Sequence, residues 1–302
     1  MNQKTLKKSY SFEGKGLHTG RYAHMTISPA AAGTGIVFRR TDLPGNAEVA
    51  ALAENVTSTA RSTTISSGDA SVVTIEHLMS ALTGMGVDNA VVEIDSPEVP
   101  ILDGSARLYA EAFAADGLEE QDSERKYLTL DREIEVRDEK SGSWVRITPA
   151  DAPSFEITAD FNSRVLGVQK AGWDGTVDYA TEIAPCRTFV FFHEIEFLAS
   201  QGLVKGGDVD NAIVIVEHPV TDEQVARLCE MLGQPRHEVT SSGYLSNVTL
   251  HFENECGRHK LLDMIGDLRL AGGWINARIT AFKPGHGINT AAAKAFRQAI
   301  CR

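Results

Sequence analysis

The chain has 302 residues, which is enough for two domains of ordinary size or one large domain. Hydrophobic residues make up 42% and charged residues 23%, a composition typical of a globular protein that can bury a sizeable core. The net charge of −12 argues against a general nucleic-acid binder, because phosphate contacts require clustered Lys and Arg. We therefore expect no nucleic-acid partner.

The cysteines and the apolar segments indicate the compartment. The four cysteines are far apart and form no CxxC pair, which is typical of reduced thiols in a cytosolic protein. No apolar segment follows the basic N-terminal residues, and no run of about 18 apolar residues occurs. The sequence predicts a cytoplasmic protein with no transmembrane segment, and we expect a monomer.

A glycine-rich segment, Glu13–Gly20, lies near the start of the chain. Its glycines match neither the GxGxxG spacing nor the Walker spacing, so we reject a nucleotide-binding fold. The simpler interpretation is a hairpin turn, and it predicts that His18 is exposed.

The first predicted helix follows Thr74, which is a suitable N-cap residue. Its apolar residues recur at the i, i+3, i+4 and i+7 positions of one face, and they are Ile75, Leu78, Met79 and Leu82. We expect Gly84 and Gly86 to end this helix and Ala90–Ile94 to form a strand.

A charged stretch separates the two halves of the chain. Glu119–Lys126 is polar and lacks apolar periodicity, so we interpret it as a linker, whereas Tyr127–Val136 alternates like a strand. We expect a first domain at residues 1–122 and a second domain at residues 127–302.

The second half predicts short strands and a few helices. Its alternating segments are Val145–Ile147, Phe155–Phe161, Ala212–Val216 and Tyr244–Phe252. We expect helices at about Gly257–Leu270 and from near Asn289, and an extra helix within residues 220–242. Strands and helices mix without a regular βαβ rhythm, which favours the α+β class.

The two halves also share a pattern. Residues 75–113 and 258–296 each contain a helix, a glycine-rich turn, an apolar strand, a loop and a second helix. A histidine near the start of each segment and a phenylalanine at its end are separated by nearly the same number of residues. This hint of an internal repeat predicts two similar domains in which His77 and His259 occupy related places.

The second-half helix carries the first candidate site residues. His259, Asp263 and Asp267 recur every four residues and share one helical face, on which Gly266 leaves room for a neighbour. An imidazole and a carboxylate at this spacing can bind one metal ion. A solvated polar face is an equally good interpretation of this pattern alone.

The first-half helix offers a third metal ligand. A catalytic zinc site needs three protein ligands and one open position, so His77 could complete the set. Glu76 beside it could accept a proton from water, whose pKa a bound zinc lowers from roughly 15.7 to about 7. The alternative is an ordinary Glu-His pair in the first turn of a helix.

His286 is the third candidate, because it lies between Gly285 and Gly287 in a predicted loop before a helix. Asp267 could orient His286 and raise its pKa, and a cationic imidazole can stabilise an oxyanion and protonate a leaving amine. A flexible surface histidine remains the alternative.

Taken together, these segments resemble one family, the UDP-3-O-acyl-N-acetylglucosamine deacetylases, which are zinc amidases of lipid A biosynthesis. The resemblance covers most of the chain and rests on SFEGKGLHTG, TIEHLMSAL, VPILDGSA, CRTFVFFHEIEFLASQGLVKGG, RHKLLDMIGDL and FKPGHGINT. It implies two similar two-layer α+β sandwiches packed face to face, each with an insert, a fold similar to domain 2 of ribosomal protein S5.

The resemblance also implies roles for individual residues. His77, His259 and Asp263 would bind Zn²⁺, although a His₂Asp site can also accept Fe²⁺. Glu76 would be the general base and His286 the protonated acid, paired with Asp267. The hydroxyl group of Thr188 would help to hold the oxyanion. The expected contacts with the UDP-sugar substrate come from Leu17, Phe161, Phe189, Glu194, Lys260 and Lys283.

The second-domain insert is expected at about residues 163–207, where it would form a hydrophobic passage for the acyl chain. The residues expected in this passage are Phe189, Phe191, Phe192, Ile195 and Leu198. Two other functions share the same residues: a zinc amidase for another acylated sugar or amine, and a metal-stabilised scaffolding protein with a closed site.

Overall fold

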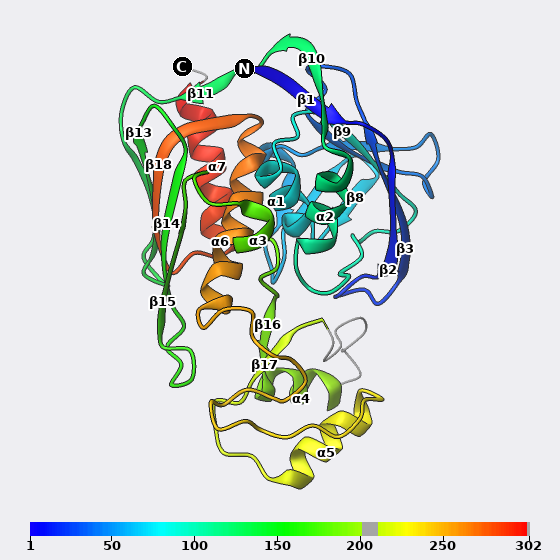
Figure 1. Cartoon of the computed structure of the whole chain (residues 1–302), viewed down its shortest axis with the longest axis vertical. Helices are drawn as coiled ribbons and strands as arrows, with labels where there is room; N and C mark the ends of the chain where they lie inside the picture. Colours follow the sequence, from blue (N-terminus) through cyan, green and yellow to red (C-terminus); the bar gives the residue numbers. More distant parts are fainter. Residues whose placement is uncertain (201–210, 301–302) are drawn as a thin grey trace.

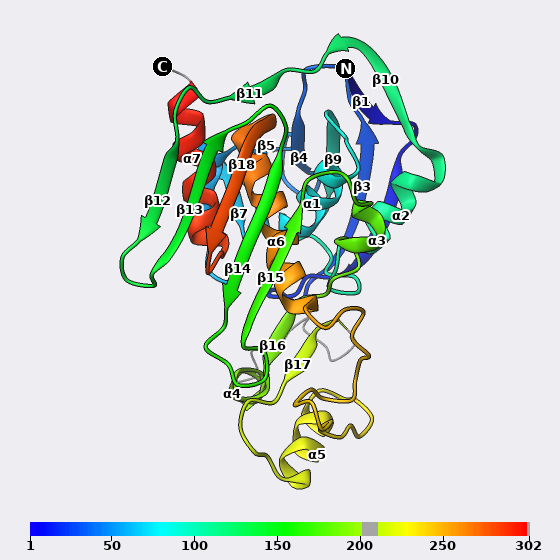
Figure 2. The ribbon, with the colours of Figure 1, turned by 60° about the vertical axis from the view of Figure 1, so that its left-hand side comes forward.

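The structure, a computed structural model, describes residues 1–200 and 211–300, and side chains throughout this range except those of residues 198–200. Two sheets form its outer layers, and helices from both halves lie between them (Figure 1). A smaller lobe built around β16, β17, α4 and α5 extends below this sandwich in both ribbon views (Figures 1 and 2).

The two main sheets have the same topology. The first-half sheet has the order β2 (Tyr10–Lys15), β3 (Tyr22–Pro29), β9 (Ala90–Ile94), β4 (Ile36–Arg40) and β5 (Glu48–Ala50). The second-half order is β12 (Ile134–Asp138), β13 (Ser143–Pro149), β18 (Trp274–Phe282), β14 (Ser154–Asp160) and β15 (Val168–Trp173). In both sheets the central strand is the last in sequence. It pairs antiparallel with the second strand in the order and parallel with the fourth. The second-half sheet has one further strand, β11 (Tyr127–Thr129), which also pairs in parallel with β18. The predicted internal repeat therefore has a structural counterpart.

The helices repeat in the same way. In the first half α1 (Glu76–Gly84) precedes β9, and α2 (Arg107–Asp116) follows it. In the second half α6 (Glu255–Leu268) precedes β18, and α7 (His286–Ile300) follows it. Alternate residues of β9 and β18 are buried beneath these helices, as expected for strands with one face on a core.

The two halves meet where α1 packs against α6. Gly266 permits this contact, because a Cβ atom at that position would lie within 3.0 Å of the backbone of Glu76 and Ser80 in α1. One hydrophobic core then runs through both halves, with fully buried leucines such as Leu78 and Leu261 contributed by each helix.

Each half carries additional segments. In the first half these are β6 (Val56–Ser58), β7 (Thr64–Ser67) and β8 (Ala70–Val73), which form a small sheet preceded by the short helix η1 (Ala53–Asn55). The second half carries α3 (Tyr179–Glu182), β16 (Phe189–Phe191), α4 (Phe192–Ser200), β17 (Ile213–Ile215) and α5 (Asp222–Met231). The lobe has its own small apolar clusters, so it packs partly independently of the main core.

The predicted linker is a strand. Residues Leu118–Glu124 form β10, which pairs with β1 (Asn2–Leu6), and the chain then enters β11 (Tyr127–Thr129), which pairs with β18. The linker interpretation was wrong because an edge strand with one solvated side can be almost entirely polar. The division into domains at 1–122 and 127–302 stays a proposal, since these segments tie the two halves together.

Several predicted boundaries also differ. Thr74 does not cap α1: its hydroxyl donates to Glu98 at 2.8 Å, and Ile75 is the N-cap residue. The predicted strand Tyr127–Val136 is divided between β11 and β12. Tyr244–Phe252 forms turns and isolated bridges, because its backbone groups pair with side chains and scattered strands.

The remaining expectations agree more closely with the structure. Strand Ala90–Ile94 has the predicted bounds, α5 lies within residues 220–242, and the glycine-rich segment turns between β2 and β3. The insert expected at residues 163–207 includes β15, which is a strand of the main sheet, and its last residues, 201–207, lie outside the described part of the chain. Within the described residues no helix has the length and apolar character needed to cross a membrane.

Candidate metal and catalytic site

A cavity of about 490 Å³ opens between the two halves and the lower lobe. Every residue predicted as a metal ligand, a catalytic group or a contact of the UDP-sugar lines it, except Asp267. These residues are Leu17, Glu76, His77, Phe161, Thr188, Phe189, Glu194, His259, Lys260, Asp263, Lys283 and His286. Segments that are far apart in the sequence therefore converge on one space, which is large enough for part of an elongated ligand.

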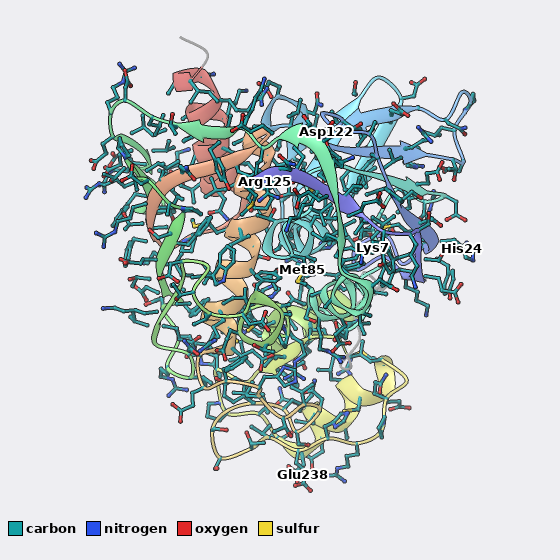
Figure 3. All side chains as sticks on the ribbon, turned by 45° about the horizontal axis from the view of Figure 1, so that its top comes forward. Lys7, His24, Met85, Asp122, Arg125 and Glu238 are labelled. Carbon is teal, nitrogen blue, oxygen red and sulfur yellow. The ribbon has the colours of Figure 1, made fainter. Side chains whose placement is uncertain are left out.

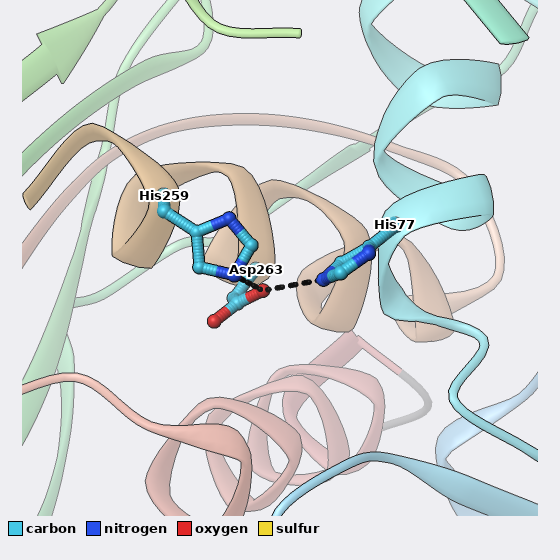
Figure 4. Close-up of side chains that lie close together, drawn as sticks. All are labelled: His77, His259 and Asp263. Carbon is cyan, nitrogen blue, oxygen red and sulfur yellow. Dashed lines mark ion pairs between the residues drawn. The ribbon is translucent and has the colours of Figure 1, made fainter. Parts of the chain in front are cut away.

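Three side chains in this cavity form a potential metal-binding group. His77 comes from the first turn of α1, whereas His259 and Asp263 face it from α6 (Figure 4). The Oδ1 atom of Asp263 lies 3.4 Å from Nε2 of His259 and 3.7 Å from Nε2 of His77. One potential ligand atom from each residue lies within 4.8 Å of the other two.

The chemistry of this group suits a divalent metal. The Nδ1–H of His259 donates to the carbonyl oxygen of Cys186 at 3.0 Å, which leaves Nε2 free to bind an ion. Burial lowers the pKa of His77 to about 3 and also lowers the pKa of His259, so both rings are neutral at pH 7. Asp263 Oδ1 is buried and has no hydrogen-bond partner among the described residues. A buried carboxylate oxygen facing two neutral imidazoles is what a metal site requires.

Lys260 holds the other oxygen of the Asp263 carboxylate. Its Nζ donates to Oδ2 at 2.9 Å, which leaves Oδ1 directed at the histidines. Burial alone would raise the pKa of Asp263, but the nearby cationic groups outweigh burial and lower it. Asp263 is therefore ionised throughout the neutral range.

Glu76 is fully enclosed beside the metal-binding group. Its Oε2 accepts a hydrogen bond from the backbone N–H of Thr63 at 3.0 Å, and its Oε1 lies 3.7 Å from Nε2 of His286. Burial raises the pKa of Glu76 to about 7. A carboxylate with this pKa can accept a proton and release it again near neutral pH.

His286 is held by a buried carboxylate. Its Nδ1 lies 3.0 Å from Asp267 Oδ2, and Asp267 also accepts hydrogen bonds from Thr63 Oγ1 at 2.6 Å and from Asn289 Nδ2 at 3.0 Å. Burial favours a neutral His286, but the charges of Asp267 and Glu76 outweigh it and raise its pKa to about 9. The imidazole is therefore a cation at pH 7.

The expectation that His286 lies in a loop was wrong, because α7 begins at this residue. Asp267 does not line the cavity, but its Oδ2 atom holds His286, which does. Asp267 lies one helical turn after Asp263 on the same face of α6, and this position places its carboxylate behind His286.

Thr188 and Phe189 reach the cavity from the lower lobe. The backbone N–H of Thr188 donates to the carbonyl oxygen of Gly104 at 2.8 Å, which joins the lobe to the first half. The ring of Phe189 meets the ring of Phe161 edge to face at 5.3 Å and lies 5.3 Å from Lys260 Nζ. These contacts make an apolar wall with one cation at its edge.

The other predicted substrate contacts lie around the rim. Lys283 Nζ is 3.3 Å from Asp160 Oδ2 and about one third exposed, so it can exchange this partner for an anionic ligand. Glu194 is in the first turn of α4, and Leu17 comes from the turn between β2 and β3.

Only part of the predicted acyl passage lines the cavity. Phe189 and Ile195 do so, whereas Phe192 packs within the core of the lower lobe and Phe191 stacks on His193 at 5.7 Å. Phe191 is the last residue of β16 and Phe192 the first of α4, and neither lines this cavity, so their assignment to the passage stays a prediction. The side chain of Leu198 lies outside the described part of the structure.

The sequence did not indicate some residues that the structure brings to the site. His18 was expected to be exposed, but it is half-buried, and its Nε2 atom has no partner among the described residues. Arg61 also lines the cavity, in a left-handed backbone conformation with φ of 67°. Thr63 supports both Glu76 and Asp267, although 204 residues separate it from the latter.

Comparison with known proteins places this site in a family. The sequence model of the LpxC family, described as UDP-3-O-acyl N-acetylglycosamine deacetylase, matches residues 3–232 and 238–298. The chain belongs to the LpxC family. The predicted resemblance is thereby confirmed, together with the α+β fold class that it implied.

Individual relatives of this LpxC-family chain carry two kinds of name. It is 43% identical to the bifunctional enzyme LpxC/FabZ of Porphyromonas gingivalis, over 99% of this chain and 64% of the relative. The bifunctional enzyme LpxC/FabZ of Bacteroides thetaiotaomicron is 42% identical, over 99% of this chain and 65% of the relative. The UDP-3-O-acyl-N-acetylglucosamine deacetylase of Teredinibacter turnerae is 38% identical, over 96% of this chain and 88% of the relative. The chain thus spans less than two thirds of the length of these bifunctional relatives.

Proposed function

We propose that this LpxC-family chain removes the N-acetyl group from UDP-3-O-acyl-N-acetylglucosamine and releases acetate and a free 2-amino group, a step of lipid A biosynthesis. The name of the Teredinibacter relative supports the substrate. The observation that carries the proposal is the unpartnered Oδ1 atom of Asp263, which faces two neutral imidazoles beside a buried base and a cationic acid.

His77, His259 and Asp263 would hold the metal, and we propose Zn²⁺ as the native ion, with Fe²⁺ as the alternative for the same donors. The bound ion would polarise the amide carbonyl and lower the pKa of a water molecule. The chain itself supplies two neutral imidazoles and one ionised carboxylate, which come from the two halves. All three side chains line the cavity, so one side of this metal-binding group faces it.

Glu76 is the proposed general base. It lies beside His77 on α1, it is buried, and its pKa of about 7 suits proton transfer at neutral pH. The Thr63 N–H fixes one carboxylate oxygen, so the other is directed toward the cavity and His286. General base catalysis of this kind contributes about 10²- to 10⁴-fold to the rate.

His286 is the proposed general acid. Its protonated Nε2 would donate to the developing oxyanion and then transfer the proton to the leaving amine. Asp267 orients the ring and keeps it charged through its contact with Nδ1. We assign the hydroxyl group of Thr188 to the oxyanion as well, because Thr188 lines the same cavity.

The rim of the cavity would hold the rest of the substrate. Lys260 and Lys283 supply positive charge for the diphosphate, and Phe161 supplies an apolar face for the nucleotide-sugar. We place Glu194 at the sugar, and Leu17 and Phe189 along the acyl chain. Buried free thiols at Cys186, Cys229 and Cys256 agree with the proposed cytoplasmic location, and the monomer stays a prediction.

One assay series tests this proposal. Purified chain is incubated with UDP-3-O-acyl-N-acetylglucosamine and with UDP-N-acetylglucosamine, and acetate release is measured together with metal content. We expect hydrolysis of the acylated substrate, its loss on chelation and its recovery with Zn²⁺. Equal turnover of both substrates would contradict the assigned acyl contacts, and unchanged activity after complete metal removal would contradict the proposed chemistry.

A further inference from the structure

A second cavity lies between the two halves, away from the proposed catalytic site. Its volume is about 330 Å³, and it shares no lining residue with the first cavity. Glycine-rich backbone at residues 33–36 forms one wall, and Arg269 and Trp274 of the second half form another. Lys126 stands at its edge with an exposed side chain.

Two buried guanidinium groups meet beside this cavity. The Cζ atom of Arg125 lies 4.0 Å from the ring centroid of Trp274, and the Cζ atom of Arg269 lies 4.7 Å from it. Both arginines are more than nine-tenths buried. Figure 3 shows Arg125 where the end of β10 approaches β1, at the junction of the halves.

Asp88 provides the carboxylate beside these two arginines, and both of its oxygens already accept hydrogen bonds. Asp88 Oδ1 accepts from Trp274 Nε1 at 2.5 Å and from Arg125 Nε at 2.9 Å. Its Oδ2 accepts from the backbone N–H of Lys4 at 2.7 Å and from Arg125 Nη2 at 2.5 Å. The Asp88 carboxylate therefore binds Arg125 directly, and no hydrogen bond joins it to Arg269.

Arg269 is consequently a buried cation with no carboxylate from the described part of the chain hydrogen-bonded to its guanidinium group. The charge of Asp88 acts on Arg269 from nearby, but Asp88 is shared with Arg125, so two cations face one carboxylate. The Nη2 atom of Arg269 reaches only the carbonyl oxygens of Val87 and Asp88, both at 3.3 Å, and its Nη1 is buried with no hydrogen-bond partner among the described residues. Burial lowers its pKa to about 10, so it remains charged at pH 7. A buried charge that is only partly compensated is destabilising, and an anion bound beside it would complete the pairing.

We propose that this cavity binds a small oxyanion, a carboxylate or a phosphate group, through Arg269 with Lys126 at the entrance. The planar guanidinium matches the oxygens of either group. The cavity, with a volume of about 330 Å³, has room for such a ligand. The bound anion would balance the charge at the junction of the two halves.

Isothermal titration calorimetry on the full metal-loaded chain tests this proposal, with inorganic phosphate and acetate as separate probes and NaCl matching the ionic strength. We expect one saturable site for at least one probe that is not shared with the catalytic cavity. Arg269→Met should raise its Kd at least about tenfold, because a hydrogen bond to a charged group contributes about 1.5–3 kcal/mol.

Two further variants keep the test decisive if Arg269→Met does not fold. Lys126→Glu changes an exposed side chain and should weaken binding severalfold, whereas Lys140→Glu, on the exposed turn between β12 and β13, should leave it unchanged. Preference for phosphate or for acetate identifies the ligand class. Absence of saturable binding, or binding unaffected by both Arg269→Met and Lys126→Glu, would overturn the proposal.

Discussion

The two halves of the chain have the same strand order but contribute differently to the site. In the first half α1 supplies one candidate ligand, His77, and the candidate base Glu76. In the second half α6 supplies His259 and Asp263, and α7 begins with the candidate acid His286. Repeated topology thus provides two helices that can approach closely, while the chemistry depends on which side chains each helix carries.

The additional segments of the two halves differ as well. The small first-half sheet positions Thr63, which supports both Glu76 and Asp267 from behind the cavity. The second-half segments place Thr188, Phe189 and Glu194 along the cavity wall. The additional segment of the first half therefore holds the proposed reacting groups in place, and those of the second half shape the cavity in front of them.

Removal of a ligand from either half should have the largest effect. We expect His77→Ala and His259→Ala each to lower kcat/KM by at least about 10³-fold, because metal-ion catalysis contributes several kcal/mol. Metal content measured on the same samples should fall for both. The exposed His24, labelled in Figure 3, provides the control, and His24→Ala should change neither quantity. Retained metal and activity in one of the two ligand variants would show that its half is not part of the site.

Substitution of the base should separate metal binding from chemistry. We expect Glu76→Gln to lower kcat by about 10²- to 10⁴-fold while the bound metal is retained, because Gln preserves the shape of the side chain but cannot accept the proton. Single-turnover kinetics and metal analysis of one preparation measure both effects. Full activity with bound metal would remove Glu76 from the proposed mechanism.

The contact between the halves can be tested at Gly266. A Cβ atom there would press on the backbone of Glu76 and Ser80, so Gly266→Ala should lower the free energy of unfolding by about 1–3 kcal/mol. Gly287→Ala is the matched helical control, because its Cβ would meet only Thr59 at 3.6 Å. Chemical denaturation compares the two variants, and equal stabilities would contradict the close approach of α1 and α6.

The smallest expected effect is a shift in pH dependence. The acid must be protonated, so kcat/KM should fall as pH rises through the pKa of His286, which the nearby carboxylates raise to about 9. Asp267→Asn removes one of these charges and should move this fall to lower pH. A pH–rate profile of wild type and variant measures the shift, and a shift to higher pH would exclude the assigned roles.

The sequence predicted those parts of the fold and site that depend on local spacing. Residues at i and i+4 of one helix share a face, so His259 and Asp263 were found together, and α1, β9 and α6 were placed within a few residues. The glycines around His286 indicated a close approach of the backbone, although they suggested a loop where α7 begins.

Other features depend on contacts between distant segments. Polar β10 is a strand because β1 pairs with it, and no local pattern in Leu118–Glu124 indicates that partner. Thr63 and His18 reach the cavity only after the halves are assembled, and the place of Phe192 in the lower-lobe core depends on α5 covering it. Such tertiary contacts override local propensity, which is why the predictions of a polar linker and of an exposed His18 failed.

The central claim is that one metal ion joins the two halves of the chain. X-ray diffraction from crystals of the purified protein, with data collected on both sides of the zinc absorption edge, tests it most directly. We predict one strong anomalous peak within bonding distance of His77 Nε2, His259 Nε2 and Asp263 Oδ1. No anomalous peak between α1 and α6 in crystals grown with Zn²⁺, or a peak bound by one half alone, would contradict the claim.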